Sequence, residues 1–403
     1  MHHRFTRTHV ALLALMFGAC STSNQPTSNT TTEHSEDTVA LRREALTNIA
    51  DNIIITQYAD FSAKTSALTQ ATKAWNDAPD NAEKRAEAQQ AWREAMASWQ
   101  HAEVFQLGPA GIMTEVAGGE DLRDLIYSWP LSNACRVDQE LAKNEFMQDG
   151  FFEAQLINIR GLDSLEYTLF YAEPENSCAP TSTVNSSGSW ATIDNITERR
   201  ASFSYALAQD IEKQAKTLEE HWTSADRDFR AEFVNAGTSS ETYSTTQEAL
   251  NALSDAMFYL EKETKDMKLA IPAGLSKCAE TTCPEAIEHP YADFALEASL
   301  ANHKAFQKLY LGNAPGEEEA RGFDDLLIDL GQDELDAEIK RLLEEAIAAH
   351  EAVEGTFSEA LAANPQQIID VYDASQAVGR VLKTQFVSIL DLEVPQRAEG
   401  DND

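Results

Sequence analysis

The stretch AQQAWREAMASWQHAE, residues 88–103, has the spacing that decides the fold. Its apolar residues recur at intervals of three and four, so they share one face of a helix. They are Ala88, Trp92, Ala95 and Trp99. With only 17 Gly and 12 Pro in 403 residues, a turn-rich all-β design is excluded, and no alternating segment of useful length predicts a strand. The sequence predicts an all-α fold.

The same helical period returns along the rest of the chain from about residue 39. The segment Glu173–Ser189, rich in Pro, Asn, Ser and Gly, interrupts the period and is the best internal boundary. The sequence therefore predicts two tandem helical bundles, residues 39–189 and 190–397, followed by an acidic tail at 398–403. Further helices are predicted at 46–68, 151–171, 196–222, 250–267, 292–311, 333–354 and 366–390.

The N-terminus has the pattern of a secretory signal. A basic start precedes the apolar run Val10–Phe17, which is too short for a stable membrane span. The Gly-Ala pair before Cys20 resembles a bacterial lipobox, which predicts a signal peptide at 1–19 and a lipid on Cys20. An ordinary signal peptide with an incidental cysteine is the alternative. Residues 20–38 are polar and predict a flexible tether.

These features predict a location in the cell envelope. Ser21 stands where an aspartate would resemble an inner-membrane retention signal, so the outer membrane, facing the periplasm, is favoured. The predicted membrane contact is made through the lipid alone.

The net charge excludes one class of partner. With 31 Lys+Arg against 67 Asp+Glu, the formal charge is −36. Such a chain repels phosphate backbones, which excludes a nucleic-acid role. The acidity raises the local concentration of cations, but by itself it identifies no cation site, and a solvated acidic surface is the simpler explanation of the charge.

Four cysteines follow the predicted signal. An even number in an oxidising compartment predicts two disulfides. Proximity favours Cys278–Cys283 and leaves Cys135–Cys178. A four-thiolate zinc site is the alternative, but the chain has no Cys-x-x-Cys.

One segment, residues 159–170, breaks the usual rule of burial. On a continuous helix, Asp163 and Glu166 fall on the apolar side of the wheel. Burying an ionised carboxylate costs several kcal/mol unless it is paired or binds a metal. A bound cation, an ion pair with an arginine such as Arg200, or a raised pKa that suits an acid or base would each compensate.

Two nearby residues extend this candidate site. Glu103 ends the Trp92–Trp99 stripe, so it is either a third interior carboxylate or a solvated helix end. Gly161 lets a ligand or another backbone approach closely, and simple helix packing is the alternative.

At this point the sequence resembles the imelysin family of bacterial envelope proteins, formerly classed as peptidases. Gly161-x-Asp163-x-x-Glu166 is similar to the family's Gly-x-His-x-x-Glu signature. Glu288-His-Pro-Tyr, followed by Asn302, is similar to its Glu-Ser-Pro-Tyr/Phe…Asn stretch. The resemblance covers nearly all of residues 40–397. It implies two helical bundles with a functional site between them, often in proteins tied to iron uptake.

The resemblance assigns five positions to that site: Gly161, Asp163, Glu166, Glu288 and Asn302. The sequence also departs from the family pattern. An aspartate, Asp163, replaces the signature histidine, and three positions that are commonly serine differ. These are His289, Ala292 and Ala295. A carboxylate keeps affinity for hard cations, and the loss of hydroxyls removes the obvious nucleophiles, so the peptidase interpretation is weakened.

Three hypotheses follow. The leading one is a non-catalytic, lipid-anchored protein that binds a divalent or ferric cation, or a metal-bearing ligand, between its bundles. The second is a metallopeptidase in which Glu166 activates a metal-bound water. The third is a structural or interaction lipoprotein whose acidic pair fixes helix packing.

Overall fold

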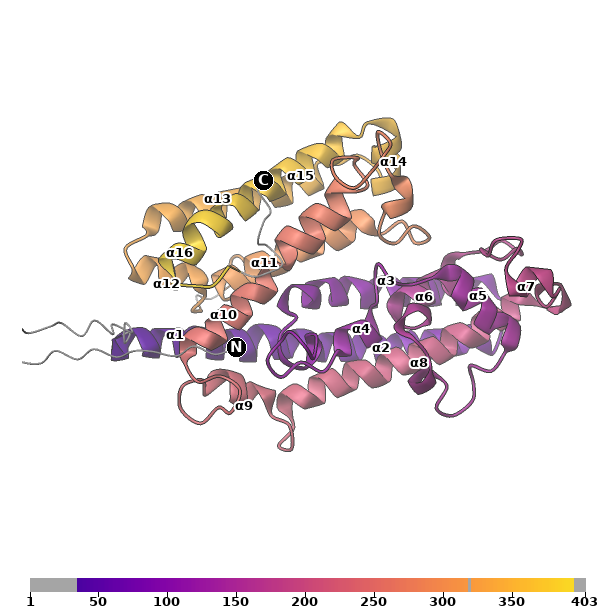
Figure 1. Ribbon diagram of the computed structural model, residues 1–403, viewed down its shortest axis with the longest axis horizontal. Helices are drawn as coiled ribbons and strands as arrows, with labels where there is room; N and C mark the ends of the chain where they lie inside the picture. The colour runs from indigo at the N-terminus through magenta and orange to yellow at the C-terminus, as the bar shows by residue number, and fades with distance from the viewer. Residues whose placement is uncertain (1–34, 318–319, 395–403) are drawn as a thin grey trace, which may run out of the picture.

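Every regular element of the structure is helical. The computed structural model describes residues 35–317 and 320–394, and no strand occurs among them (Figure 1). The predicted all-α fold is confirmed. The predicted signal peptide, Cys20 and the tail at 398–403 lie outside the described residues.

The first long helix runs through three consecutive segments: α1 (Glu36–Asn48), the π-helical η1 (Ile49–Ile54) and α2 (Ile55–Asn76). It begins inside the segment that the sequence analysis expected to be a tether, because Ser35 caps it by accepting the Thr38 N–H at 3.2 Å.

The first bundle packs four helices around a core rich in aromatic residues. They are α2, α3 (Ala82–Ala102), α6 (Gly161–Phe170) and α8 (Ile196–Thr223). The stripe that decides the fold lies in this core, where Trp99 packs on Phe61 with ring centroids 4.9 Å apart. Trp92 donates its ring N–H to the Leu162 carbonyl at 2.9 Å, which ties α3 to α6.

Helix α8 follows the predicted boundary at residues 189–190 but packs on α2 and α6. The chain therefore leaves the first bundle after α8, later than the composition of the loop suggests. The apolar side of α8 explains the difference, because it is buried against the earlier helices. Its buried apolar residues include Phe203, Leu207, Ile211, Leu218 and Trp222.

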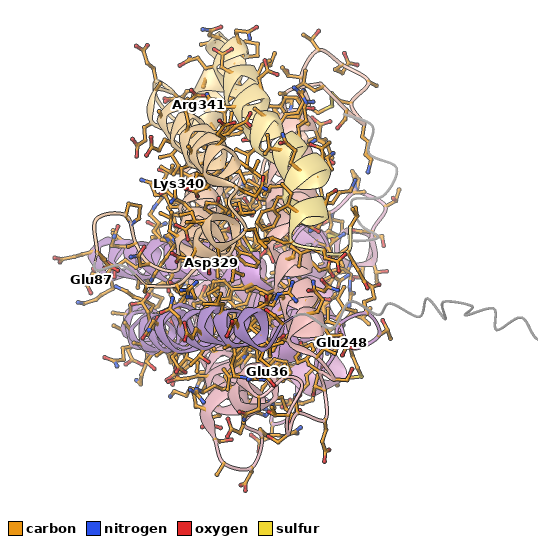
Figure 2. The ribbon with its side chains drawn as sticks, turned by 90° about the vertical axis from the view of Figure 1, so that its left-hand side faces the viewer. Glu36, Glu87, Glu248, Asp329, Lys340 and Arg341 are labelled. Atoms are coloured by element: carbon orange, nitrogen blue, oxygen red, sulfur yellow. A yellow bond between two sulfur atoms is a disulfide. The ribbon has the colours of Figure 1, made fainter. Side chains whose placement is uncertain are left out.

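The second bundle forms the other layer in Figure 1, drawn in orange and yellow. It contains the π-helical η7 (Leu260–Ala270), α11 (Ala295–Leu311), α13 (Asp333–Glu351) and α15 (Gln366–Val381). Helix α11 also packs against α3, so it joins the two layers. Charged side chains, among them Glu87, Asp329 and Arg341, cover the surface of both (Figure 2).

The other α- and π-helical elements of the described residues are shorter, and short 3-10 turns lie between them. These shorter helices are α4 (Leu122–Ile126), α5 (Ala134–Lys143), α7 (Thr183–Ser186), α9 (Phe229–Val234), α10 (Thr246–Met257), α12 (Phe323–Asp329), α14 (Phe357–Ala363), η9 (Leu382–Phe386) and α16 (Val387–Ile389). None of the described helices is long and apolar enough to cross a membrane.

The helix predicted at 151–171 is wrong in its first half. Two 3-10 turns precede Arg160, whose backbone is extended, and α6 begins only at Gly161. Gly161 has a φ of +80°, and a Cβ there would lie 2.7 Å from the carbonyl oxygen of Ile126. Another backbone therefore occupies the space that this glycine leaves, and the turn ends any continuous helix.

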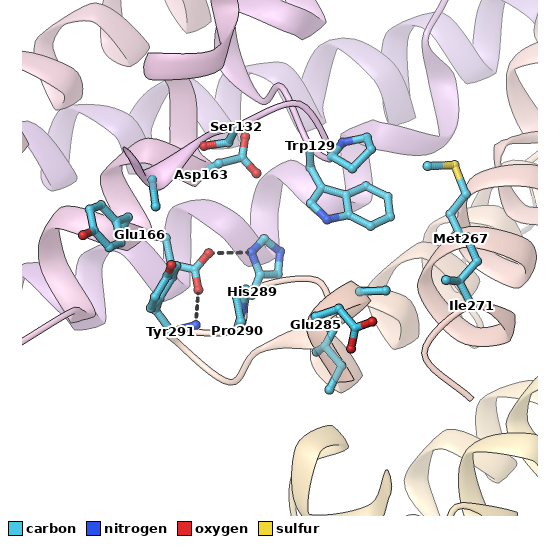
Figure 3. A pocket seen from close by; sticks show the side chains of 15 residues that line it. Trp129, Ser132, Asp163, Glu166, Met267, Ile271, Glu285, His289, Pro290 and Tyr291 are labelled. Atoms are coloured by element: carbon cyan, nitrogen blue, oxygen red, sulfur yellow. Dashed lines mark hydrogen bonds and ion pairs between the residues drawn. The ribbon is translucent and has the colours of Figure 1, made fainter. Parts of the chain in front are cut away.

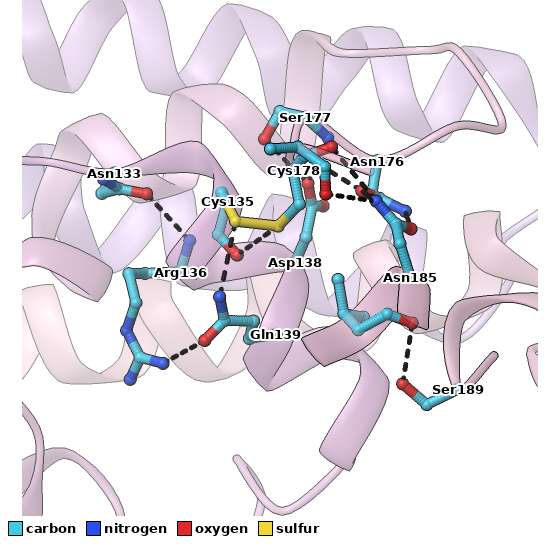
Figure 4. The surroundings of a disulfide bond; sticks show 12 residues. Asn133, Cys135, Arg136, Asp138, Gln139, Asn176, Ser177, Cys178, Asn185 and Ser189 are labelled. Carbon is cyan, nitrogen blue, oxygen red and sulfur yellow. Dashed lines mark hydrogen bonds between the residues drawn. A yellow bond between two sulfur atoms is a disulfide. The ribbon is translucent and has the colours of Figure 1, made fainter. Parts of the chain in front are cut away.

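Both predicted disulfides are present. Cys135–Cys178 joins the start of α5 to the loop after α6, and Cys278–Cys283 closes a loop after η7. Beside the first bridge, the Asp138 carboxylate accepts the Ser177 N–H at 2.7 Å (Figure 4). The bridge and this bond fix the loop at residues 173–189, whose composition predicts a domain boundary.

Candidate ligand-binding site

A cavity of about 310 Å³ lies where α6 faces the loop between η7 and α11 (Figure 3). Its walls therefore come from both bundles. The polar and aromatic residues that line it include Trp129, Asp163, Glu166, Tyr167, His289 and Tyr291.

Glu166 fastens the loop of the second bundle to α6. Its Oε1 accepts the N–H groups of Tyr291 at 2.9 Å and Ala292 at 2.8 Å. Its Oε2 lies 3.3 Å from Nδ1 of His289. Both oxygens of this buried carboxylate are thus engaged in contacts with the loop.

Asp163 has fewer partners. Its Oδ2 accepts the Ser128 N–H at 2.9 Å and, more weakly, the Ser128 hydroxyl at 3.4 Å, and no described residue donates a hydrogen bond to Oδ1. The residue is 8% exposed and faces the cavity. Burial raises the pKa of Asp163 to about 7; Glu166 adds to the shift, whereas His289 and the Ser128 N–H oppose it.

His289 lies between two carboxylates. Nδ1 faces Glu166, and Nε2 is 3.5 Å from Oε1 of Glu288. Burial alone would lower the pKa of His289, but Glu288 and Glu166 outweigh it and raise this pKa above its usual value. The backbone of His289 has a φ of +54°, which is uncommon outside glycine and indicates that its neighbours hold it in place.

Behind this pair lies a fully buried polar network. The ammonium of Lys268 is 3.0 Å from Oε1 of Glu288, 2.7 Å from Oε1 of Gln100 and 2.9 Å from Oδ1 of Asn302. The Tyr127 hydroxyl also donates to Glu288. Burial raises the pKa of Glu288, but Lys268 and His289 outweigh burial, so the net shift is downward. The resemblance assigns Glu288 and Asn302 to the site. They do not line the cavity; they contact the ammonium of Lys268 in the network behind His289.

The sequence that forms this site can be compared with known protein families. The imelysin family model matches residues 54–385. The chain belongs to the imelysin family.

Among curated relatives of this imelysin-family chain, iron-regulated protein A of Synechococcus elongatus is 24% identical over 211 residues. The match covers 52% of this chain and 49% of that protein, so it spans about half the length of the relative.

Two crystal structures show the same fold. A protein of Parabacteroides distasonis ATCC 8503 that is assigned as an iron-regulated protein A precursor has a TM-score of 0.69 at 17% identity, covering 87% of this chain and 95% of its own. An imelysin-like protein of Psychrobacter arcticum 273-4 has a TM-score of 0.67 at 15% identity, covering 88% and 97%.

Arg200 does not pair with the acidic residues of α6, so the alternative of an ion pair with this arginine is wrong. Its guanidinium donates to the carbonyls of Tyr171, Glu173 and Glu175 at 3.2, 2.6 and 3.2 Å. Arg200 lies near the start of α8, beside the C-terminal end of α6, so it holds the following loop.

Glu103 is interior, so the alternative of a solvated helix end is wrong. It is 0% exposed and accepts the Tyr259 hydroxyl at 2.5 Å, with Arg123 at 3.4 Å. It does not line the cavity. This carboxylate belongs to a neighbouring ion pair.

Sequence reasoning missed Lys268, Gln100 and Tyr127. Lys268 lies in the π-helical η7, whose wider turns shift side chains off the 3.6-residue period on which the prediction depends. The one signal in the sequence is that Lys268 directly follows the apolar face of the helix predicted at 250–267.

Within residues 35–317 and 320–394, no group of three or more His, Cys, Asp and Glu side chains is placed to hold a metal ion. Carboxylate and imidazole are ligand types that suit iron. Glu166 and His289 now contact each other. To bind one ion together with Asp163, they would have to give up this contact and turn toward the metal.

Proposed function

We propose that this imelysin-family protein is a non-catalytic binding protein of the cell envelope, anchored by a lipid on Cys20. It takes a positively charged or metal-bearing small ligand into the cavity between its bundles. The observation that carries the proposal is Asp163, a largely buried carboxylate that faces the cavity and whose Oδ1 accepts no hydrogen bond from a described residue.

The electrostatics of the cavity support a positive ligand. A buried carboxylate without a counterion is costly, and an opposite charge nearby removes that cost. Glu166 and Glu288 already face His289 and Lys268. No described residue forms a direct ion pair with Asp163, and His289 and Arg123 only partly oppose the rise in its pKa, so a cation in the cavity would gain most from Asp163.

A link to iron is part of the proposal. It is supported by the name of the relative, iron-regulated protein A. Asp163, whose Oδ1 accepts no hydrogen bond from a described residue, would contact an iron-bearing ligand, because carboxylate oxygen coordinates iron.

The peptidase alternative is less well supported. A metallopeptidase base must take a proton from a metal-bound water. Glu166 Oε1 already accepts the N–H groups of Tyr291 and Ala292, and its Oε2 faces Nδ1 of His289, so neither oxygen is free to bind a water.

The test uses chelator-treated protein titrated calorimetrically with Fe²⁺ and with ferric citrate, together with cleavage of an unfolded protein substrate. We expect saturable binding to the wild type, at least tenfold weaker binding to Asp163→Asn, and no cleavage. Chelator-sensitive cleavage that disappears in Glu166→Gln would establish the peptidase instead.

The anchor is tested separately. Cys20→Ala should move the protein from the membrane fraction to the soluble fraction, because the lipid supplies the proposed attachment. Unchanged, detergent-dependent fractionation of this variant would refute the anchor.

A further inference from the structure

The cavity has an uneven distribution of charge. Carboxylates stand on two walls, Asp163 on α6 and Glu285 on the loop after η7, and none of the fifteen lining residues is Lys or Arg (Figure 3). Glu166 is balanced by His289 at 3.3 Å. Asp163 and Glu285 therefore have no direct ion-pair partner among the described residues, although Asp163 accepts a hydrogen bond from the Ser128 N–H.

Aromatic rings provide the second feature. Trp129, Tyr167 and Tyr291 line the same cavity, and Tyr291 is 38% exposed. The indole of Trp129 lies between Asp163 and Met267 in Figure 3. The face of an aromatic ring attracts cations, most strongly for tryptophan, and its surface also accommodates methylene groups.

The size of the cavity is the third feature that limits the ligand. At about 310 Å³ it falls at the lower end of small-molecule pockets, which span roughly 300–1,000 Å³. It therefore holds a small organic molecule rather than a peptide chain.

We propose that the ligand is a small organic cation, a protonated amine or guanidinium on a short apolar chain. This inference rests on the proposed function and names the class of ligand. The cationic group pairs with Asp163, and the apolar chain lies against Trp129. A second cationic group at the other end of the chain is drawn toward Glu285.

The experiment titrates the purified full chain with agmatine, which carries a guanidinium and an ammonium on four methylenes. The uncharged 1,5-pentanediol and Fe²⁺ are titrated alongside it. Asp163→Asn should weaken agmatine binding at least tenfold. Glu280→Gln is the matched control, because it removes an equal charge from an exposed residue of the nearby disulfide loop that does not line the cavity.

A second variant tests the proposal independently of whether Asp163→Asn folds. Ala134 lines the cavity at the start of α5, and Ala134→Leu would fill part of it and should also abolish agmatine binding. Equal binding by wild type and Asp163→Asn, or equal loss in Glu280→Gln, would overturn the inference. Binding of Fe²⁺ without agmatine would overturn the inference and leave the proposed function standing. Binding of neither would refute both.

Discussion

Asp163 and Glu166 lie three residues apart on α6, yet their surroundings differ. Glu166 receives two backbone N–H groups and faces His289. Asp163 receives one backbone N–H, and its pKa is raised to about 7. The helical spacing predicted that both would be interior, but which of the two would be stabilised depends on residues more than a hundred positions away.

The two amide variants should therefore change stability in opposite directions when no ligand is present. Glu166→Gln replaces a carboxylate that accepts charge-assisted bonds and should lower stability by about 1.5–3 kcal/mol. Asp163→Asn keeps an oxygen for the Ser128 N–H and removes an unpaired charge, so stability should rise by about 1–3 kcal/mol. Thermal unfolding in chelator at pH 8 measures both. A fall for Asp163→Asn as large as that for Glu166→Gln would contradict this assignment.

The gain from Asp163→Asn should depend on pH. The folded-state pKa of Asp163, about 7, lies above the unfolded value of about 3.9, so ionisation favours the unfolded chain. The penalty is absent below about pH 4, grows as the pH rises, and is complete above about pH 7. The melting temperatures of the wild type and of Asp163→Asn should be equal at pH 4 and should differ by pH 8, where the variant melts at the higher temperature. A constant difference across this range would show that Asp163 does not titrate as described.

At the scale of the element, the start of α6 depends on Gly161. With a φ of +80° and the Ile126 carbonyl 2.7 Å from any Cβ, Gly161→Ala should suffer both backbone strain and a steric clash. Gly150→Ala is the matched control, because Gly150 has a φ of +75° with open space around it. The control should cost about 1 kcal/mol and Gly161→Ala at least about 2 kcal/mol more in denaturant unfolding. Equal losses would show that the contact with Ile126 is unimportant.

Two buried histidines make the second bundle sensitive to acid. The rings of His303 on α11 and His350 on α13 lie 4.5 Å apart. Each Nδ1 lies within hydrogen-bond distance of the backbone carbonyl four residues earlier, and Nε2 of His303 is 2.9 Å from Oγ of Ser375 on α15. Two ammonium groups face the pair, those of Lys268 from η7 and Lys304 from α11. Both rings are therefore held neutral.

Burial lowers the pKa of His350 to about 4, and burial together with His350 lowers that of His303. A lowered histidine pKa means that the stability present above pH 6.5 is lost as the pH falls toward 4. His350→Phe should reduce this acid loss by up to about 1.4 kcal/mol per pH unit. Urea unfolding at pH 7.0, 5.5 and 4.5 measures the slope. The same slope in wild type and variant would contradict the prediction.

The elements also show what the sequence could predict. The 3.6-residue period located the long helices because each buries one apolar face, as the Trp92–Trp99 stripe does. It failed before Gly161, where a positive φ breaks the helix, and it missed Lys268, where a π-helical segment changes the period. Local backbone conformations of this kind are fixed by tertiary contacts that no periodic pattern contains.

At the scale of the whole molecule, the site exists because two bundles meet. Lys268 and Asn302 from the second bundle and Gln100 from the first share hydrogen bonds, and Glu288 and His289 approach α6 from the loop. The resemblance to imelysins predicted that Glu288 and Asn302 would come near the signature. It did not predict that an imidazole, His289, would reach Glu166 from the position where serine is common.

The central claim is that the cavity beside Asp163 holds a positively charged or metal-bearing small ligand. Native mass spectrometry of the protein isolated from its own cell envelope tests it most directly. We expect a non-covalent adduct of small mass on the wild type and on Glu280→Gln, absent from Asp163→Asn and from Ala134→Leu. An adduct that persists in Asp163→Asn, or no adduct on any of the four proteins, would contradict it.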